Sequence, residues 1–303
     1  MRDGGAAEGF YLGGDLTEVR EETSMAFATV NGVRLFYEVS GRGDPIVLIP
    51  GLGLDHTYFR YAVPELERYF QVVAYDPRGM GRSDRPAVEY TMELWAEDLK
   101  QLLAHLGIEN AHIVGSSLGG CVALALLRQE PGIARSLILL AAFSELDRAL
   151  ETNFRMRIAI VEALGMTGII RDHVLLWTLS REFIESERGK QAADGLLAAL
   201  GTNDPKLYVE FLKSILRFGR VMPGQEKEPK YTSYLSQMTV PTLVVVGDRD
   251  ILTPVPFSRT ITERMPNAEL AIIKDCGHIT FIERPEENTR LIVDFLRRQA
   301  GGA

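Results

Sequence analysis

The sequence predicts an α/β protein: one mostly parallel, eight-stranded sheet, flanked by helices, with an inserted helical block. Short β-branched runs alternate with helical patterns over most of the 303 residues, which is typical of parallel sheets. An antiparallel hairpin opens the series, because Met25–Val30 and Val33–Val39 flank Asn31-Gly32, a sequence typical of a two-residue hairpin turn. After the sixth predicted strand the alternation stops, and only helical patterning follows until the seventh strand.

Six further strands are expected where apolar, β-branched runs are bounded by turn residues. They comprise residues 46–49, 70–75, 112–115, 135–142, 240–247 and 269–274. Helices are expected over residues 59–69, 91–106 and 285–298. Thr91 is expected to cap the second of these helices through its side-chain oxygen, and Pro285 is typical of the first position of the third.

The order of these elements predicts three units. Residues 1–24 form a Gly-rich, acidic extension that we expect to be flexible. Residues 25–143 and 236–303 form the α/β core, and residues 144–235 form a helical cap inserted into it. No signal peptide is visible, and the longest apolar runs are too short to span a bilayer.

Composition narrows the range of partners. With 46% hydrophobic and 24% charged residues, the chain has the balance of an ordinary globular protein. A net charge of −8 argues against nucleic acid and anionic membrane surfaces as partners, because both select for basic patches.

Cys121 and Cys276 give neither a disulfide framework nor a metal-ligand spacing, so we expect these cysteines to have packing roles and the protein to be cytoplasmic. No phosphate loop or dinucleotide fingerprint is present; no cofactor or metal is expected, and a homodimer is one assembly that the sequence allows.

The candidate nucleophile lies in Gly115-Ser116-Ser117-Leu118-Gly119, between a β-branched run and an apolar helical segment. A strand that reverses into a helix within two residues holds the corner residue in a strained conformation, and small neighbours make that corner possible. Only Ser117 fits this G-x-S-x-G register, since a valine precedes Gly115. Its hydroxyl is then presented at a helix N-terminus, where a base can take its proton.

A serine nucleophile needs a base, and the base needs an orienting carboxylate. His278 follows the last predicted strand, so it leaves the same edge of the sheet as Ser117. Asp250 is the expected acid, because Asp248 stands too close to the end of the preceding strand. Glu145, just beyond the sixth strand, is the less favoured alternative.

Further motifs carry a resemblance to a known family. Residues 76–83 are similar to its D-x-R-G-x-G-x-S motif, and Gly277-His278 is followed by Glu283-Arg284-Pro285. Together with the order Ser, Asp, His, these motifs resemble the α/β-hydrolase superfamily from about Met25 to Arg298. The pattern is most similar to the 3-oxoadipate enol-lactonase and small carboxylesterase group.

The resemblance implies an α/β-hydrolase fold and an oxyanion hole formed by the backbone N–H groups of Leu52 and Leu118. One departure is Pro50-Gly51, where relatives usually carry His-Gly; the Leu52 amide is unaffected by this change. Asp76 together with Arg78 is expected to hold the glycine-containing loop in place.

The sequence therefore predicts a serine hydrolase that cleaves a carboxylic ester or lactone of a small to medium, largely apolar substrate through an acyl-enzyme. A C–C bond hydrolase, a perhydrolase or acyltransferase with the same triad, and a non-catalytic ligand-binding receptor of the same fold remain alternatives. The expected substrate contacts are Gly51, His56, Phe143, Trp177 and Ile279. The arginines of the cap would suit a carboxylated substrate, but they are interpreted as solvated surface charge. They include Arg148, Arg155, Arg181 and Arg217.

Overall fold

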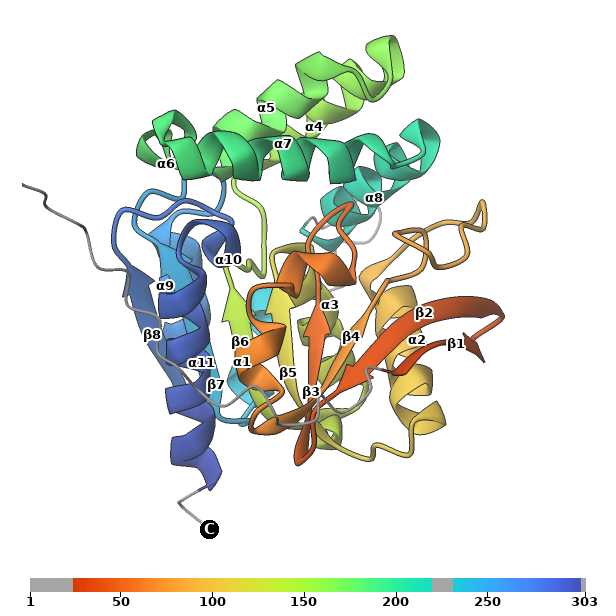
Figure 1. Cartoon of the computed structure of the whole chain (residues 1–303), viewed down its shortest axis with the longest axis vertical. Coiled ribbons are helices and arrows are strands. Elements are labelled where there is room, and N and C mark those ends of the chain that lie inside the picture. Colours follow the sequence, from red (N-terminus) through yellow and green to blue (C-terminus); the bar gives the residue numbers. More distant parts are fainter. Residues whose placement is uncertain (1–23, 220–230, 301–303) are drawn as a thin grey trace, which may run out of the picture.

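The computed structural model describes residues 24–219 and 231–300. Its eight strands form one sheet in the order β1-β2-β4-β3-β5-β6-β7-β8 (Figure 1). The strands are β1 (Ser24–Val30), β2 (Val33–Ser40), β3 (Asp44–Ile49), β4 (Phe70–Tyr75), β5 (Ala111–Ser116), β6 (Ala134–Leu140), β7 (Thr242–Gly247) and β8 (Ala268–Ile273). Strand β2 pairs antiparallel with β1 and β4, and the other pairs are parallel. The predicted fold class is confirmed.

The opening hairpin turns at Asn31 and Gly32, whose φ angles are 45° and 75°. Both residues therefore adopt the left-handed conformation that a tight hairpin turn requires and that Asn-Gly accepts at low cost. Strand β6 ends at Leu140, two residues earlier than expected, because the φ angle of Ala141 is 49° and breaks the extended backbone.

The core strands are buried on both faces and align apolar residues in rows. Leu48 of β3 lies opposite Val114 of β5, which lies opposite Ile138 of β6, which lies opposite Leu243 of β7. All four side chains are buried. Each contributes about 1.5–3 kcal/mol relative to an exposed position. This burial explains why the strands appear in the sequence as continuous apolar runs.

Helices cover both faces of the sheet. They are α1 (Val63–Leu66), α2 (Met92–His105), α3 (Leu118–Gln129), α9 (Val255–Arg264), α10 (Thr280–Glu283) and α11 (Pro285–Ala300). Helices α2 and α3 pack together on one face, and α1 packs against α11 on the other (Figure 1). The Thr91 side chain accepts a hydrogen bond from the Leu94 N–H, as expected of a helix cap.

The predicted helix over residues 59–69 is wrong in extent. A short 3-10 turn, His56–Phe59, precedes the four-residue α1. Pro64 stands in the first turn of α1. Because proline has no N–H to donate backward along a helix, it can begin a helix but cannot continue one from Phe59.

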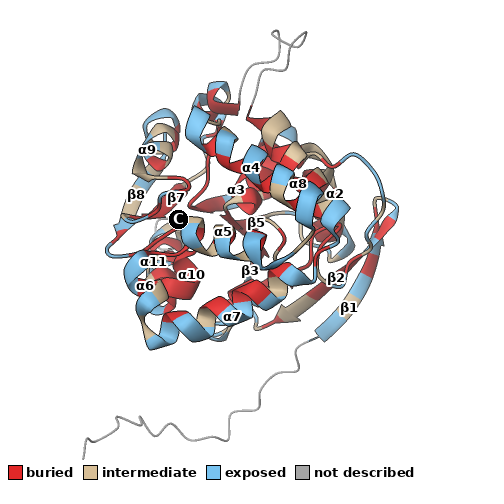
Figure 2. Ribbon diagram, turned by 90° about the horizontal axis from the view of Figure 1, so that it is seen from above, coloured by how far each residue is buried: buried red, intermediate tan, exposed pale blue. Residues whose placement is uncertain are grey.

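Between β6 and β7 the described chain forms helices only: α4 (Arg148–Leu164), α5 (Gly168–Thr178), α6 (Arg181–Glu185), α7 (Glu187–Gly201), α8 (Pro205–Phe218) and two short 3-10 turns. The cap helices α4 to α8 lie over one edge of the sheet (Figure 1). Figure 2 views them from above, with exposed and buried residues alternating along them.

The predicted extension at residues 1–24 lies outside the described residues except for Ser24, which begins β1. No helix in the described part of the chain is long and apolar enough to cross a membrane.

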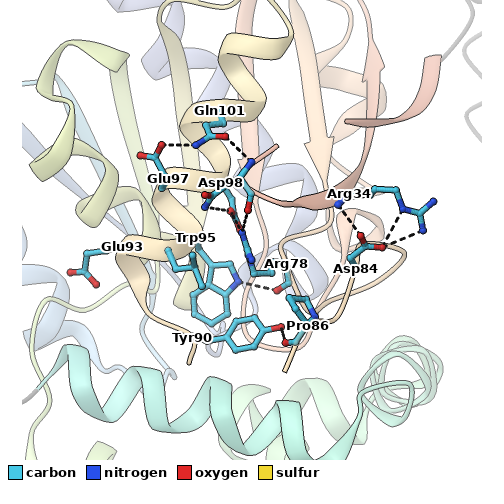
Figure 3. A network of polar contacts seen from close by, with 12 residues as sticks. Arg34, Arg78, Asp84, Pro86, Tyr90, Glu93, Trp95, Glu97, Asp98 and Gln101 are labelled. Carbon is cyan, nitrogen blue, oxygen red and sulfur yellow. Dashed lines mark hydrogen bonds and ion pairs between the residues drawn. The ribbon is translucent and has the colours of Figure 1, made fainter. Parts of the chain in front are cut away.

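The loop of residues 76–83 is fixed by a buried ion pair that differs from the expected one (Figure 3). Arg78 donates from Nε and Nη2 to the two carboxylate oxygens of Asp98 in α2, at 2.7 and 2.6 Å. Asp76 instead accepts hydrogen bonds from the backbone N–H groups of His56 and Arg82. The expectation that Asp76 and Arg78 act together is corrected: they hold the loop through separate partners. Removing one member of a buried pair of this kind costs about 3–5 kcal/mol.

Candidate active site

The turn between β5 and α3 places Ser117 at a sharp corner. Ser117 has φ 52° and ψ −114°, a conformation that costs about 1–3 kcal/mol for a residue with a side chain. Glycines allow the close packing around it. A Cβ at Gly115 would lie 2.5 Å from the carbonyl oxygen of Gly119, and one at Gly119 would lie 2.2 Å from that of Ile49. The strand–corner–helix geometry predicted for this motif is therefore present.

The structure brings Ser117, His278 and Asp250 together. His278 Nε2 lies 2.9 Å from Ser117 Oγ, and His278 Nδ1 lies 2.9 Å from Asp250 Oδ2. The carboxylate can only accept at neutral pH, so the imidazole proton is assigned to Nδ1 and Nε2 accepts from the serine hydroxyl. The three residues follow β5, β7 and β8, which are parallel and end at the same edge of the sheet.

The Asp250 carboxylate is fixed by the turn that follows it. Its Oδ1 accepts hydrogen bonds from the backbone N–H groups of Leu252 and Thr253, both at 2.8 Å. The Thr253 hydroxyl lies 2.8 Å from Asp250 Oδ2 and 3.0 Å from both His278 Nδ1 and the Ala141 carbonyl oxygen. Thr253 was not predicted from the sequence; its contact with the acid and the base appears only once the turn is formed.

The other two acids considered from the sequence have different partners. Asp248 Oδ2 pairs with Lys274 Nζ at 3.3 Å. Glu145 Oε2 accepts a hydrogen bond from the Thr232 hydroxyl at 2.9 Å. Of the three carboxylates, Asp250 is the one whose oxygen lies within hydrogen-bonding distance of His278 in the described structure.

The loop that carries His278 is tied to the cap helices. The buried Glu283 carboxylate accepts hydrogen bonds from the N–H of Gly277 at 3.0 Å, the N–H of Ser180 at 2.9 Å and the Ser180 hydroxyl at 2.5 Å. Burial raises the pKa of Glu283, and these hydrogen bonds oppose that shift. One carboxylate thus joins the residue before His278 to the segment between α5 and α6.

A mostly apolar pocket opens in front of Ser117, between the sheet edge and the cap helices. The core contributes Gly51, Leu52, Leu54, Tyr58, Ser116, Ser117, Leu252, His278 and Ile279. The cap helices contribute Phe154, Arg157, Val174, Thr178, Leu196, Leu200, Tyr208 and Ile215. Such a pocket, apolar with a few polar groups, is typical of a site for a small organic molecule.

The expected substrate contacts divide into two groups. Gly51 and Ile279 line this pocket, whereas His56, Phe143 and Trp177 do not. His56 lies 2.6 Å from Asp76 through Nδ1 and is turned toward the loop of residues 76–83. Phe143 is packed in the core against other aromatic rings, and Trp177 stacks on the His173 ring of its own helix.

Several pocket residues were not predicted. The Tyr58 hydroxyl lies 3.0 Å from Ser116 Oγ beside the nucleophile, and Arg157 reaches the pocket from α4. The helical spacing of Phe154 and Arg157, three positions apart, could have placed them on one face. The sequence gives no signal of which face meets the pocket.

The two backbone segments expected to form an oxyanion hole both lie next to Ser117. Leu118 is the first residue of α3, where an N–H has no acceptor within its own helix. A Cβ at Gly51 would lie 3.6 Å from Ser117 Cβ, so the Gly51-Leu52 segment approaches the nucleophile closely.

One cluster could offer metal ligands: atoms of Asp55, His56 and Asp76 lie within 4.8 Å of one another. They already make protein hydrogen bonds. Asp76 Oδ1 lies 2.6 Å from His56 Nδ1, and Asp55 Oδ1 accepts from the backbone N–H of Thr57 at 2.9 Å. Hydrogen bonding within the loop accounts for this arrangement.

The chain belongs to the family described as alpha/beta hydrolase fold, which matches residues 44–285, and it is a hydrolase. It is 27% identical over 281 residues to a putative carbamate hydrolase, RutD, of Caulobacter sp., covering 91% of this chain and 100% of that protein. It is 28% identical to an AB hydrolase superfamily protein, YisY, of Bacillus subtilis, covering 88% of this chain and 97% of the relative.

Solved structures agree with this assignment. A thermophilic esterase from Thermogutta terrifontis, determined with malate bound, superposes with a TM-score of 0.79 at 26% identity, covering 91% of this chain and 99% of that one. The enol-lactonase from Burkholderia xenovorans superposes with a TM-score of 0.80 at 25% identity, covering 90% and 100%. The predicted resemblance to the superfamily is confirmed.

Proposed function

We propose that the protein is a serine hydrolase that cleaves a carboxylic ester or lactone through an acyl-enzyme. The observation that carries the proposal is the continuous chain of contacts from Ser117 Oγ to His278 Nε2 and from His278 Nδ1 to Asp250, each at 2.9 Å. This is the contact pattern by which an imidazole activates a serine hydroxyl.

The first step forms the acyl-enzyme. Ser117 Oγ attacks the carbonyl carbon while His278 Nε2 takes the hydroxyl proton, and Asp250 stabilises the resulting imidazolium. The imidazolium then gives that proton to the leaving alkoxide oxygen as the ester bond breaks. In the second step Nε2 takes a proton from water, the hydroxide attacks the acyl carbon, and the proton returns to Ser117 Oγ as the acid leaves.

Negative charge develops on the carbonyl oxygen in both steps. We assign its stabilisation to the backbone N–H groups of Leu52 and Leu118. A preorganised donor of this kind contributes about 3–4 kcal/mol, because it acts on charge that appears only in the transition state.

The lining of the pocket supports a small to medium substrate with a largely apolar body. Aliphatic side chains from the core and from the cap helices surround the nucleophile: Leu52, Leu54, Val174, Leu196, Leu200, Ile215 and Leu252. The esterase and enol-lactonase neighbours favour ester and lactone bonds, and the relatives named putative carbamate hydrolases make a carbamate the second candidate. A carbamate carbonyl can be attacked by the same serine.

The test compares the wild type with Ser117→Ala on p-nitrophenyl butyrate, on γ-lactones and on a p-nitrophenyl carbamate of matched size. We expect ester or lactone turnover by the wild type and none by Ser117→Ala, with equal thermal unfolding midpoints. Retained turnover in Ser117→Ala would remove this serine from the mechanism. Exclusive turnover of the carbamate would reassign the substrate, and absence of labelling of Ser117 by a fluorophosphonate probe would favour a ligand-binding role.

A further inference from the structure

The turn that carries the proposed oxyanion donor Leu52 is bound at its tip by the cap. The N–H of Leu54 donates to the carbonyl oxygen of Gly51 at 3.2 Å, which closes a four-residue turn. Leu52 and Gly53 occupy its two central positions. The Gly53 carbonyl oxygen accepts a hydrogen bond at 2.9 Å from Nδ2 of Asn203, a buried residue between α7 and α8. Two segments that lie 150 residues apart in the sequence therefore meet at this turn.

The side-chain amide of Asn203 is oriented by the carbonyl oxygens around it. Its Nδ2 lies 2.9 Å from the Gly53 oxygen and 3.0 Å from the oxygen of Leu200, in the last turn of α7. A carbonyl oxygen can only accept, so the amino group of the amide, and not its oxygen, must face both of them. The two N–H bonds of this amino group thus join the cap to the turn of residues 51–54. Asn203 is only 8% exposed, so water does not readily replace these hydrogen bonds.

Close packing restrains both ends of the turn. Gly53 has a φ angle of 68°, and a Cβ there would lie 3.1 Å from Tyr208 Cε2 and 3.2 Å from Asn203 Nδ2. At the other end, a Cβ at Gly51 would lie 3.6 Å from Ser117 Cβ. The turn is therefore held between the nucleophile on one side and the connection between α7 and α8 on the other.

We infer that Asn203 is a positioning residue of the oxyanion hole: its hydrogen bond to Gly53 fixes the turn so that the Leu52 N–H points at the oxygen on which charge develops. A backbone donor stabilises the transition state most when it is already aimed at that oxygen. The cap then does more than enclose the substrate, because it holds one of the groups that lower the barrier. This inference rests on the proposed function and adds to it a dependence of catalysis on the cap.

The first experiment separates transition-state binding from ground-state binding with two propyl ketones. Ser117 Oγ adds to the trifluoromethyl ketone, the carbonyl π electrons move to the oxygen to give a hemiketal oxyanion, and His278 Nε2 keeps the hydroxyl proton. The methyl ketone, whose carbonyl is far less electrophilic, reports binding of the uncharged carbonyl.

Asn203→Ala should weaken binding of the oxyanion and leave binding of the uncharged carbonyl nearly unchanged. We expect the Ki of the trifluoromethyl ketone to rise about 10- to 100-fold, up to the cost typical of misplacing a catalytic group by about 1 Å. The kcat for p-nitrophenyl butyrate should fall by a similar factor. The Ki of the methyl ketone and the KM of the ester should change by less than about threefold, because these report the ground state.

The matched control is Thr202→Ala, at the neighbouring position. The Thr202 hydroxyl donates to the Ala199 carbonyl oxygen at 2.8 Å, a contact within the cap, so its removal should leave the ratio of the two Ki values unchanged. An unchanged ratio in Asn203→Ala would overturn the inference; with hydrolysis still dependent on Ser117, it would leave the proposed function standing. Equal inhibition of the wild type by the two ketones would overturn both.

A second variant reaches the same contact from the core and decides the matter even if Asn203→Ala does not fold. A methyl group at Gly53 would press on Asn203 and Tyr208, so Gly53→Ala should also raise the Ki of the trifluoromethyl ketone more than that of the methyl ketone. Asn203→Ala removes one of these neighbours, so the two changes should be less than additive in the logarithm of Ki. Additive losses, or wild-type Ki values in Gly53→Ala, would overturn the positioning role.

Discussion

The backbone N–H of His278 donates a hydrogen bond to the carbonyl oxygen of Thr178 at 2.9 Å. Thr178 is the last residue of helix α5, so the proposed base is held by the cap helices as well as by the sheet. Glu283 reinforces the link by accepting from Gly277 on one side and from Ser180 on the other. The position of the imidazole and the position of one wall of the pocket are therefore coupled.

This coupling predicts the effect of Glu283→Gln. An amide has one acceptor oxygen, whereas the carboxylate has two. At least one of the three donors, the N–H groups of Gly277 and Ser180 and the Ser180 hydroxyl, therefore loses its acceptor. This loss should lower the free energy of unfolding by about 1–3 kcal/mol. We also expect kcat to fall more than KM changes, because the base is displaced while the pocket remains. Urea unfolding and steady-state kinetics measure both effects. Glu286→Gln, at an exposed position of α11, is the control; equal behaviour of the two variants would contradict this role of Glu283.

The two carboxylates after β7 make a matched pair for testing the proposed acid. Asp250→Asn should lower kcat by about 10,000-fold, because an amide cannot hold the imidazole in the required tautomer. Asp248→Asn removes the charge that pairs with exposed Lys274 and Arg249 and should change kcat little. Single-turnover kinetics on the same ester decides between them, and a large loss in Asp248→Asn alone would reassign the acid.

The sequence predicted the sheet and the three residues of the proposed triad, which the structure brings together, because each of these has a local signal. Ser117 is marked by its flanking glycines, and His278 and Asp250 follow apolar strands whose ends must meet. The unpredicted residues depend on packing between distant segments. Arg157 could not be distinguished from the solvated arginines near it, since helical periodicity does not say what covers a face. The partner of Arg78, Asp98 in helix α2, is likewise set only when the loop and the helix are packed together.

The loop beside the first 3-10 turn should make stability depend on pH through His56. Burial alone would lower the pKa of His56, but the hydrogen bond to Asp76 and the charges of Asp76 and Glu38 outweigh it, and the pKa is raised. A histidine whose folded pKa exceeds its unfolded value of about 6.5 contributes its full stabilisation below that value and loses it as pH rises through the folded pKa. The stability difference between the wild type and His56→Asn should therefore be larger at about pH 5.5 than at about pH 9. Urea unfolding at the two pH values measures it, and a difference that grows with pH would have the wrong sign.

The close approach of α3 to β3 predicts the effect of adding one methyl group at Gly119. A Cβ there would lie 2.2 Å from the Ile49 carbonyl oxygen and 2.7 Å from that of Pro50, both backbone atoms that cannot rotate away. Gly119→Ala should therefore force the helix N-terminus off the sheet, lowering the free energy of unfolding by about 1–3 kcal/mol or more and shifting Ser117 relative to His278. The control is Gly132→Ala, where a Cβ meets nothing within 4 Å; it should change stability by no more than about 0.5 kcal/mol. Urea unfolding measures the change in stability, and the rate of fluorophosphonate labelling measures the displacement of Ser117. If Gly119→Ala were labelled at the wild-type rate and were as stable as the wild type, the corner would not be as tightly packed as these distances require.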